Sequence, residues 1–204
     1  QNVGLIQASD GRKMSKRYGN VINPDDIVAT FGADSLRVYE MFMGPFDQSI
    51  AWSTDNMMGA RRMIERLWKL SNNVVDANTH ATETEVLVHQ TIKKVGDDIE
   101  SFGFNTAIAQ MMILLNHLEK LPKVPKATYE TLLKLLAPFA PHVTQELWVM
   151  LGNTSELYRE VWPVYDTAKT ISAKMVIALQ INGKLRDTIE VLRETSEEEI
   201  KKIA

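Results

Sequence analysis

The sequence contains no cysteine among its 204 residues. This absence excludes thiol catalysis, a disulfide scaffold and any zinc or iron–sulfur centre held by cysteine ligands. No run of 18 apolar residues occurs, so the sequence predicts no membrane-spanning helix. A secretory signal peptide, with its basic start and apolar core, is also missing. These absences fit a reducing compartment, and we expect a cytoplasmic protein with no membrane partner.

An excess of basic charge is missing as well. The chain has 23 Lys and Arg residues against 26 Asp and Glu residues, for a net charge of −3. Proteins that bind nucleic acid through overall charge are strongly basic, so any such surface here must be a local patch. The hydrophobic share of 45% is typical of globular proteins, and the length fits one or two domains. Residues 1–10 have no helix-start signal, and we expect an internal piece of a larger protein.

Most of the chain is predicted to be helical. Asn23 as N-cap and Pro24 at the first helical position predict a short helix that Gly32 ends, followed by a second short helix. Between about residues 54 and 152, apolar residues recur mostly every three or four positions in five successive segments. Short connections between amphipathic helices favour antiparallel neighbours, so these segments predict a helical bundle.

The last 33 residues have a different pattern. Apolar residues alternate from Met175 onward, Asn182-Gly183 is a strong hairpin signal, and the alternation continues to Val191. Ser196 and Glu199 have the spacing of a helix capping box. This predicts a β-β-α unit, and because a two-stranded ribbon cannot bury both faces, we expect a missing remainder. Residues 164–170 are the predicted linker.

A basic cluster near the start of the chain is the strongest chemical signal. Four basic residues occupy six positions: Arg12, Lys13, Lys16 and Arg17. Lysines three residues apart on a short loop can converge on one phosphate group, and Ser15 between them offers a hydroxyl. The residues alone leave two interpretations open, a phosphate-binding loop or a solvated basic loop.

Residues 10–16, Asp-Gly-Arg-Lys-Met-Ser-Lys, followed by Gly-Asn-Val at 19–21, resemble the second signature loop of class I aminoacyl-tRNA synthetases. That signature is usually written Lys-Met-Ser-Lys-Ser, and Arg17 stands here in place of its last serine. Residues 23–24 and 31–37 resemble the segment after this loop in the leucine, isoleucine, valine and methionine branch.

Later landmarks resemble the same branch. Residues 138–142 and 146–148 resemble its anticodon-binding bundle. Residues 180–186 on the predicted hairpin resemble the C-terminal appendage of bacterial-type leucyl-tRNA synthetases, as do residues 104–109 and Trp52. The resemblance therefore spans nearly the whole chain.

The resemblance implies a reaction in which leucine attacks the α-phosphate of ATP and is then transferred to tRNA-Leu. The loop would close over ATP through Lys13, Ser15 and Lys16, with Lys13 and Lys16 as catalytic residues that stabilise the departing pyrophosphate. Such charges can be worth roughly 3 kcal/mol each. Mg²⁺ would share this role, and both ATP and Mg²⁺ would bind mainly to a catalytic domain elsewhere. The first class I signature, His-x-Gly-His, is missing, so we expect this chain to be inactive alone.

Two groups of basic residues are candidates for tRNA binding. Arg62, Arg66 and Lys69 share one face of a predicted bundle helix, and Lys184 and Arg186 flank the hairpin tip. Arg and Lys bind RNA phosphates without sequence specificity. The alternative for both groups is an ordinary solvated surface.

Other polar and aromatic residues are expected to be structural. The four histidines have no close spacing, so no metal site is predicted, and His142 is expected to be a helix-cap or core residue. Trp68 and Trp148 lie on helical stripes and are expected in the bundle core. Asp97 and Asp98 are expected on a solvated helix face.

The resemblance divides the chain into three parts. Residues 1–52 would be the tail of the class I catalytic domain, 53–165 the helical tRNA-binding bundle, and 171–204 the start of the β-β-α appendage. The fold class is therefore mainly α, and the predicted function is the C-terminal part of a monomeric leucyl-tRNA synthetase. An isoleucyl-, valyl- or methionyl-tRNA synthetase and a non-catalytic helical RNA-binding module remain alternatives. The hairpin favours leucine, while Lys13 and Lys16 favour a synthetase.

Overall fold

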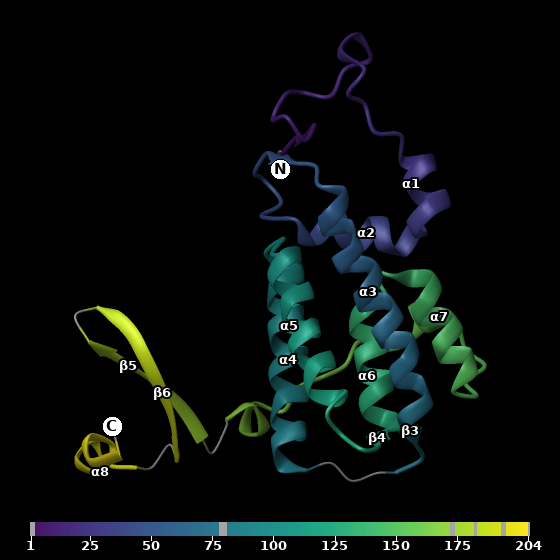
Figure 1. Ribbon diagram of the computed structural model, residues 1–204. Helices are drawn as coiled ribbons and strands as arrows, with labels where there is room; N and C mark the ends of the chain where they lie inside the picture. Colours follow the sequence, from purple (N-terminus) through teal and green to yellow (C-terminus); the bar gives the residue numbers. More distant parts are fainter. Residues whose placement is uncertain (1–2, 78–80, 172–173, 182, 193–194, 204) are drawn as a thin grey trace.

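The computed structural model describes residues 3–77, 81–171, 174–181, 183–192 and 195–203. A bundle of long helices carries an extended loop at one end, and a β-β-α unit stands to one side (Figure 1). The mainly α fold class is thus confirmed. The helices are α1 (Pro24–Phe31), α2 (Ala33–Phe42), α3 (Thr54–Leu70), α4 (Thr82–Glu100), α5 (Phe104–Leu118), α6 (Lys126–Leu136), α7 (Pro141–Met150) and α8 (Glu197–Ile203). The strands are β1 (Ile6–Gln7), β2 (Ile50–Ala51), β3 (Val74–Val75), β4 (Val124–Pro125), β5 (Lys174–Ile181) and β6 (Lys184–Leu192).

The first helices begin and end at the residues that the sequence indicates. The Asn23 side chain accepts a hydrogen bond from the Asp25 backbone N–H at 3.2 Å, and Pro24 opens α1. Gly32 ends α1 with a φ of 88°, a backbone conformation that residues other than glycine rarely adopt. Helix α2 then packs into the bundle, where Val38 and Tyr39 are buried.

A short parallel pairing anchors the N-terminal segment. β1 pairs with β2 through Ile6 with Ile50 and Gln7 with Ala51. At Gly4 an added Cβ would lie 1.9 Å from the Gln48 carbonyl oxygen, so only glycine allows this approach of the two segments. The base of the basic loop is therefore tied to the chain that leads into α3.

The core lies among α3, α5 and α6 and is almost wholly apolar. Among its fully buried side chains are Met57, Leu67, Ile108, Met111, Leu114, Leu115, Leu118, Leu132, Leu133 and Leu135. The buried Tyr129 hydroxyl donates to the Leu67 carbonyl at 2.7 Å, and burial raises the pKa of Tyr129 far above its ordinary value. Because Tyr129 lies on α6 and Leu67 on α3, this bond joins two helices through the core.

A second parallel pairing closes the far end of the bundle. β3 pairs with β4 through Val74 with Val124 and Val75 with Pro125. The segment after α3 therefore lies beside the segment after α5 at this end (Figure 1).

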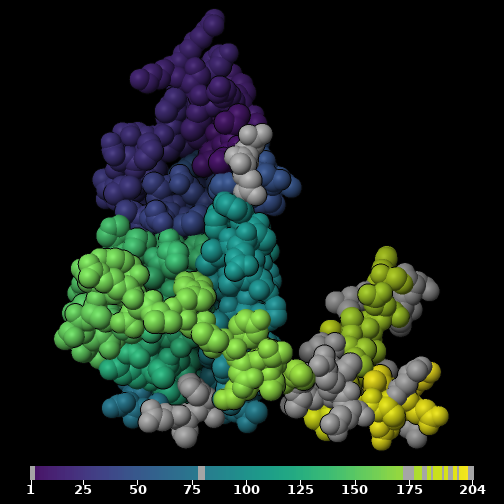
Figure 2. All heavy atoms as spheres, turned by 180° about the vertical axis from the view of Figure 1, so that it is seen from behind, coloured from purple at the N-terminus to yellow at the C-terminus, as the bar shows by residue number. Residues whose placement is uncertain are grey.

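The segment after α7 is held against the bundle. Glu160, next to the 3₁₀ turn at Leu157–Arg159, accepts from Lys134 of α6 at 3.1 Å. Within the predicted linker, the Asp166 N–H donates to His89 Nδ1 of α4 at 3.1 Å. Lys169, in the turn at Thr167–Thr170, pairs with Glu85 at 2.6 Å. The predicted linker is thus packed on α4. Figure 2 shows the chain after α7 crossing the rear face of the bundle toward this linker.

The C-terminal unit is the predicted hairpin and helix. β5 and β6 are antiparallel, with Ile177 opposite Ile189 and an irregularity between Leu179 and Gln180. Residue 182 of the predicted turn lies outside the described residues, whereas Gly183 has a φ of 74°. The capping box is confirmed, since Ser196 N–H donates to Glu199 Oε2 at 3.1 Å and Glu199 N–H to Ser196 Oγ at 3.4 Å. Within the described ranges, no helix has the length and apolar content needed to cross a membrane.

Three predictions of side-chain position are wrong. Trp68 is 41% exposed, because position 68 of α3 faces a groove rather than the core. Asp98 is buried, because its side of α4 meets the start of α5, and it pairs with Lys94. The His142 ring is exposed and neither caps a helix nor enters the core; the residue that caps α7 is Asp34.

Candidate functional site

The basic loop is built on a tight turn. The Ala8 N–H donates to the Arg12 carbonyl at 2.8 Å, and the Gly11 N–H donates to the Ala8 carbonyl at 2.9 Å. Gly11 has a φ of 76°, which the turn requires. Gln7 then forms an antiparallel bridge with Lys13. The turn projects the tip of the loop away from the bundle (Figure 1).

Asn20 fixes the shape of the loop tip. Its Oδ1 accepts from the Ser15 backbone N–H at 2.9 Å, and its Nδ2 donates to the Lys13 carbonyl at 3.4 Å. The Ser15 hydroxyl oxygen accepts from the Arg17 N–H at 3.3 Å and caps the 3₁₀ turn Lys16–Tyr18. Ser15 therefore shapes the backbone between the two lysines while its own O–H remains able to donate.

Among the described residues, only one of the four clustered cations is neutralised. Arg12 Nε donates to Asp10 Oδ2 at 2.7 Å, and this hydrogen bond holds the pKa of the Asp10 carboxyl below its ordinary value. Lys13, Lys16 and Arg17 are exposed, and their side chains make no ion pair within the described part of the chain. The loop therefore presents three free positive charges, an arrangement that favours a polyanion such as a polyphosphate.

The three basic residues of α3 have different environments. Arg62 and Lys69 are exposed, and the described residues offer neither of them an ionic partner. Arg66 instead donates from Nε to both Glu119 oxygens, at 2.9 and 3.2 Å, and also bonds to Asn116. The hydrogen bonds to Glu119 raise the pKa of Arg66 above its ordinary value. The guanidinium of Arg66 thus joins α3 to α5.

Arg61, which sequence reasoning did not single out, holds α3 to the end of α1. Its Nε donates to Glu65 Oε1 at 2.9 Å, and its Nη1 donates to the Phe31 carbonyl at 3.1 Å. The signal for it was the Arg61–Glu65 spacing of four residues, which places both on one helix face. The negative charge of Glu65 is therefore balanced by Arg61 rather than by the candidate residues Arg62 and Lys69.

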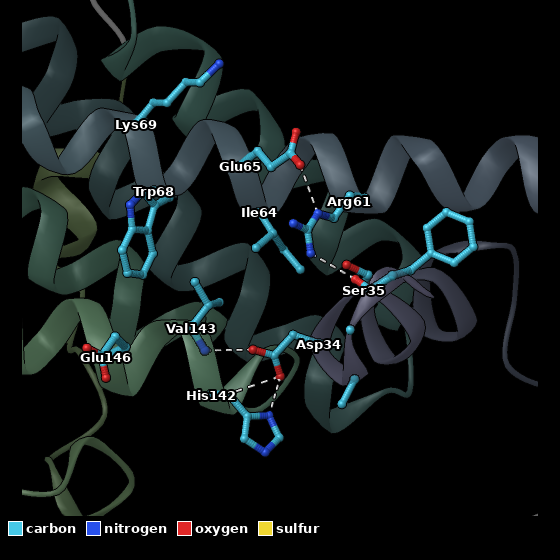
Figure 3. Close-up of a pocket in the computed structure, with 13 residues that line it drawn as sticks. Asp34, Ser35, Arg61, Ile64, Glu65, Trp68, Lys69, His142, Val143 and Glu146 are labelled. Atoms are coloured by element: carbon cyan, nitrogen blue, oxygen red, sulfur yellow. Dashed lines mark hydrogen bonds and ion pairs between the residues drawn. The ribbon is translucent and has the colours of Figure 1, made fainter. Parts of the chain in front are cut away.

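A groove of about 890 Å³ lies between the α1–α2 junction, α3 and α7. Figure 3 shows Trp68 and Lys69 of α3 on one side of it and Glu146 of α7 on another. Ile64 and Val143 give the groove an apolar lining. A planar group could stack on the exposed indole of Trp68, with a cation and a carboxylate within the same groove.

The groove wall is held by a buried carboxylate. Asp34 accepts from the Val143 N–H at 2.7 Å and from His142 Nδ1 at 2.7 Å (Figure 3). It thereby satisfies backbone donors at the start of α7. On the neighbouring turn of α2, Arg37 Nη2 donates to the carbonyl oxygen of Pro138 at 2.7 Å. The two sequence landmarks at 31–37 and 138–142 are therefore in direct contact.

The predicted hairpin residues lie apart from the other candidates. Lys184 and Arg186 are exposed on β6, in the C-terminal unit, and neither has an ion-pair partner among the residues described. The structure thus places Lys13 and Lys16 together on the loop, Arg62 and Lys69 together on α3, and the hairpin pair on the separate unit.

The described histidines do not gather. His89, His117 and His142 lie on α4, α5 and α7, and His80 lies outside the described residues. Across the residues that can be described, no three His, Cys, Asp or Glu side chains group together as a set that could hold a metal ion.

Two protein-family models match this chain, one in its N-terminal part and one over the bundle and the C-terminal unit. Residues 2–53 match the family model described as "tRNA synthetases class I (I, L, M and V)". Residues 84–202 match the model described as "Anticodon-binding domain of tRNA ligase". The chain belongs to the class I tRNA synthetase family of the I, L, M and V group, including its anticodon-binding domain, and the family resemblance is confirmed.

Among solved structures, the chain is similar to the leucyl enzyme in the "Crystal structure of the ternary complex of Agrobacterium radiobacter K84 agnB2 LeuRS-tRNA-LeuAMS". The sequence identity is 33% and the TM-score is 0.79. The match covers 99% of this chain and 29% of that chain, so this chain spans less than a third of its relative's length.

Proposed function

We propose that this chain is the C-terminal part of a leucyl-tRNA synthetase, an enzyme that activates leucine with ATP and transfers it to tRNA-Leu. The similarity to a LeuRS over 99% of this chain supports leucine over isoleucine, valine or methionine. The observation that carries the catalytic part is the loop, whose Lys13 and Lys16 are unpaired among the described residues. A helical module that only bound RNA would need no such loop. The proposed division remains 1–52, 53–165 and 171–204.

The loop geometry suggests how these lysines act on ATP. In leucine activation, a leucine carboxylate oxygen bonds to the α-phosphorus, and the bond to the bridging oxygen breaks as pyrophosphate leaves with its electron pair. Asn20 bonds to the backbone of both Lys13 and Ser15, so the two lysines are carried on one fixed stretch. Positive charges fixed where negative charge develops lower the barrier, by about 3 kcal/mol for one such group.

We expect Mg²⁺ to accompany ATP in the parent enzyme. Asp10, the one carboxylate within residues 8–20, is committed to Arg12, so the loop offers the ion no free carboxylate ligand. The proposed contribution of this chain is therefore the positive charge of Lys13 and Lys16 together with the hydroxyl of Ser15.

The proposed tRNA contacts are Arg62 and Lys69 on α3 and Lys184 and Arg186 on β6. All four are exposed, and their charges are not neutralised by other described residues. Arg66, the remaining residue of this predicted set, would contribute mainly by holding α3 against α5. The proposed setting is a monomeric enzyme in the cytoplasm.

The test is single-turnover leucyl-adenylate formation by the parent enzyme. Lys16→Ala should slow adenylation about 100-fold with leucine affinity changed less than about twofold, because the charge acts mainly in the transition state. The control is Lys93→Ala, which removes an exposed lysine from α4 and should leave the rate unchanged. An unchanged rate in Lys16→Ala would refute the role of the loop.

Two further measurements separate the alternatives. The 204-residue chain alone should show no leucine-dependent pyrophosphate exchange, and robust exchange would refute the proposed division. Charging assays of the parent enzyme with leucine, isoleucine, valine and methionine in turn should select leucine, and preference for another amino acid would refute that specificity.

A further inference from the structure

Two lysines outside the predicted set lie at the end of the bundle where α3 and α5 finish. Lys120 follows α5 after one residue, and Lys123 directly precedes β4. Both are exposed, and their side chains make no hydrogen bond or ion pair with other described residues. Both lie in the connection between α5 and β4, outside any helical stripe, so the sequence pattern did not connect them with the basic residues of α3.

Two contacts bring these lysines beside the end of α3. Arg66 of α3 binds Glu119, the residue immediately before Lys120. The pairing of Val74 with Val124 places the segment that follows α3 next to Lys123. Because one contact lies on each side of the α5–β4 connection, that connection is fixed against the C-terminal end of α3.

The acidic residues of this region are mostly neutralised. Glu119 is bound by Arg66, and Glu65 is bound by Arg61. Asp76, just after β3, and Glu83, at the start of α4, are exposed and have no ionic partner among the described residues, but they are two negative charges against the four positive charges of Arg62, Lys69, Lys120 and Lys123. The end of the bundle therefore keeps a net positive charge although the whole chain has a net charge of −3.

We propose that Arg62, Lys69, Lys120 and Lys123 form one phosphate-binding surface that takes the sugar–phosphate backbone of RNA. Arg62 and Lys69 are seven residues apart, about 10 Å along the helix axis, so the surface reaches more than one phosphate. Lysine is a compact charge suited to phosphate and carries no base specificity. This inference rests on the proposed tRNA-binding function and widens its α3 surface to the α5–β4 connection.

The test measures tRNA-Leu binding to the 204-residue chain by fluorescence anisotropy at three salt concentrations. Lys120→Gln with Lys123→Gln should weaken binding about tenfold or more at about 0.1 M salt. It should also flatten the log–log salt slope by roughly 1.4–1.8, the value expected for two lost phosphate contacts. The loss should be similar for a non-cognate tRNA. Thermal unfolding should be nearly unchanged, because exposed substitutions rarely alter stability by more than about 0.5 kcal/mol.

The matched control is Asn105→Asp with Thr106→Glu, which changes the net charge equally at the opposite end of α5. Acidic residues there complement the helix N-terminus, so folding should be retained. A control that keeps the wild-type slope, beside a flattened slope in the lysine variant, supports the surface. Equal slopes in both variants would refute it. A wild-type chain without salt-dependent tRNA binding would refute the proposed tRNA function itself, which distinguishes the two failures.

Discussion

Replacing Arg66 by alanine should destabilise the bundle much more than replacing its neighbour Arg62. Arg66 bonds to both oxygens of Glu119 and to Asn116, and so joins α3 to α5 across 53 residues of sequence. Arg62 lies one turn earlier on the same helix and has no ionic partner among the described residues. Comparing the Arg66→Ala and Arg62→Ala variants therefore isolates the effect of the interhelical contact.

The loss of stability in Arg66→Ala depends on how exposed the Arg66–Glu119 ion pair is. The side chains of Arg66 and Glu119 are 39% and 32% exposed, so water screens their attraction in part. Exposed ion pairs contribute about 0.2–1 kcal/mol to stability. Because Arg66 contacts both carboxylate oxygens of Glu119, we place this ion pair near the upper limit. The bond to Asn116 adds about 0.5–1 kcal/mol. We expect Arg66→Ala to cost about 1–2 kcal/mol and Arg62→Ala less than about 0.5 kcal/mol.

The assay is urea unfolding of Arg66→Ala, Glu119→Ala and the double variant. A double-mutant cycle should give a coupling energy of about 1 kcal/mol that decreases at high salt. For a chain of this size, a loss of about 1 kcal/mol corresponds to about 2–4 °C in Tm. Equal stability of Arg66→Ala and Arg62→Ala, with no coupling to Glu119, would refute this reasoning and return Arg66 to the set of free phosphate ligands.

Two further predictions concern the tryptophans and the segment after α7. Trp148→Ala should cost about 3–5 kcal/mol, because Trp148 is only 4% exposed, whereas Trp68→Ala should cost clearly less; urea unfolding that gives the reverse order would contradict the fold. Glu160 accepts from the Ser155 hydroxyl and from Lys134, and these bonds lower the pKa of its carboxyl below its ordinary value of 4.5. Its contacts should therefore stabilise the segment at neutral pH and be lost as the pH falls through that lowered pKa. An NMR titration of Glu160 should show a midpoint below 4.5, and a midpoint at or above 4.5 would contradict the assignment.

Local signals in the sequence predicted the helices and the hairpin well. Asn23, Gly32 and the pair Ser196 and Glu199 act within a few residues of their own position, so their effect on the backbone does not depend on the distant chain. The basic loop could also be predicted from the sequence, because its lysines and its turn glycine lie within one short stretch.

Contacts between distant segments could not be predicted in this way. Asp34 bonds to α7 across 109 residues, and nothing near either position indicates the partner. Trp68 was expected in the core because its spacing on α3 fits the apolar stripe, but the helices that flank this edge leave a groove. The division of labour between Arg62 and Arg66 likewise depends on where α5 lies.

The packing of α2 has a practical consequence for truncation. By sequence this helix precedes residue 53, yet Val38 and Tyr39 are buried in the bundle, and the Tyr39 hydroxyl accepts from the Ser53 N–H at 2.8 Å. A shortened version that started at residue 53 would lose this helix and expose the apolar surface beneath it to solvent. It would also leave the amides at the start of α7 without the Asp34 carboxylate. An expression fragment of the bundle should therefore start upstream of Asn23, so that α1 and α2 are retained.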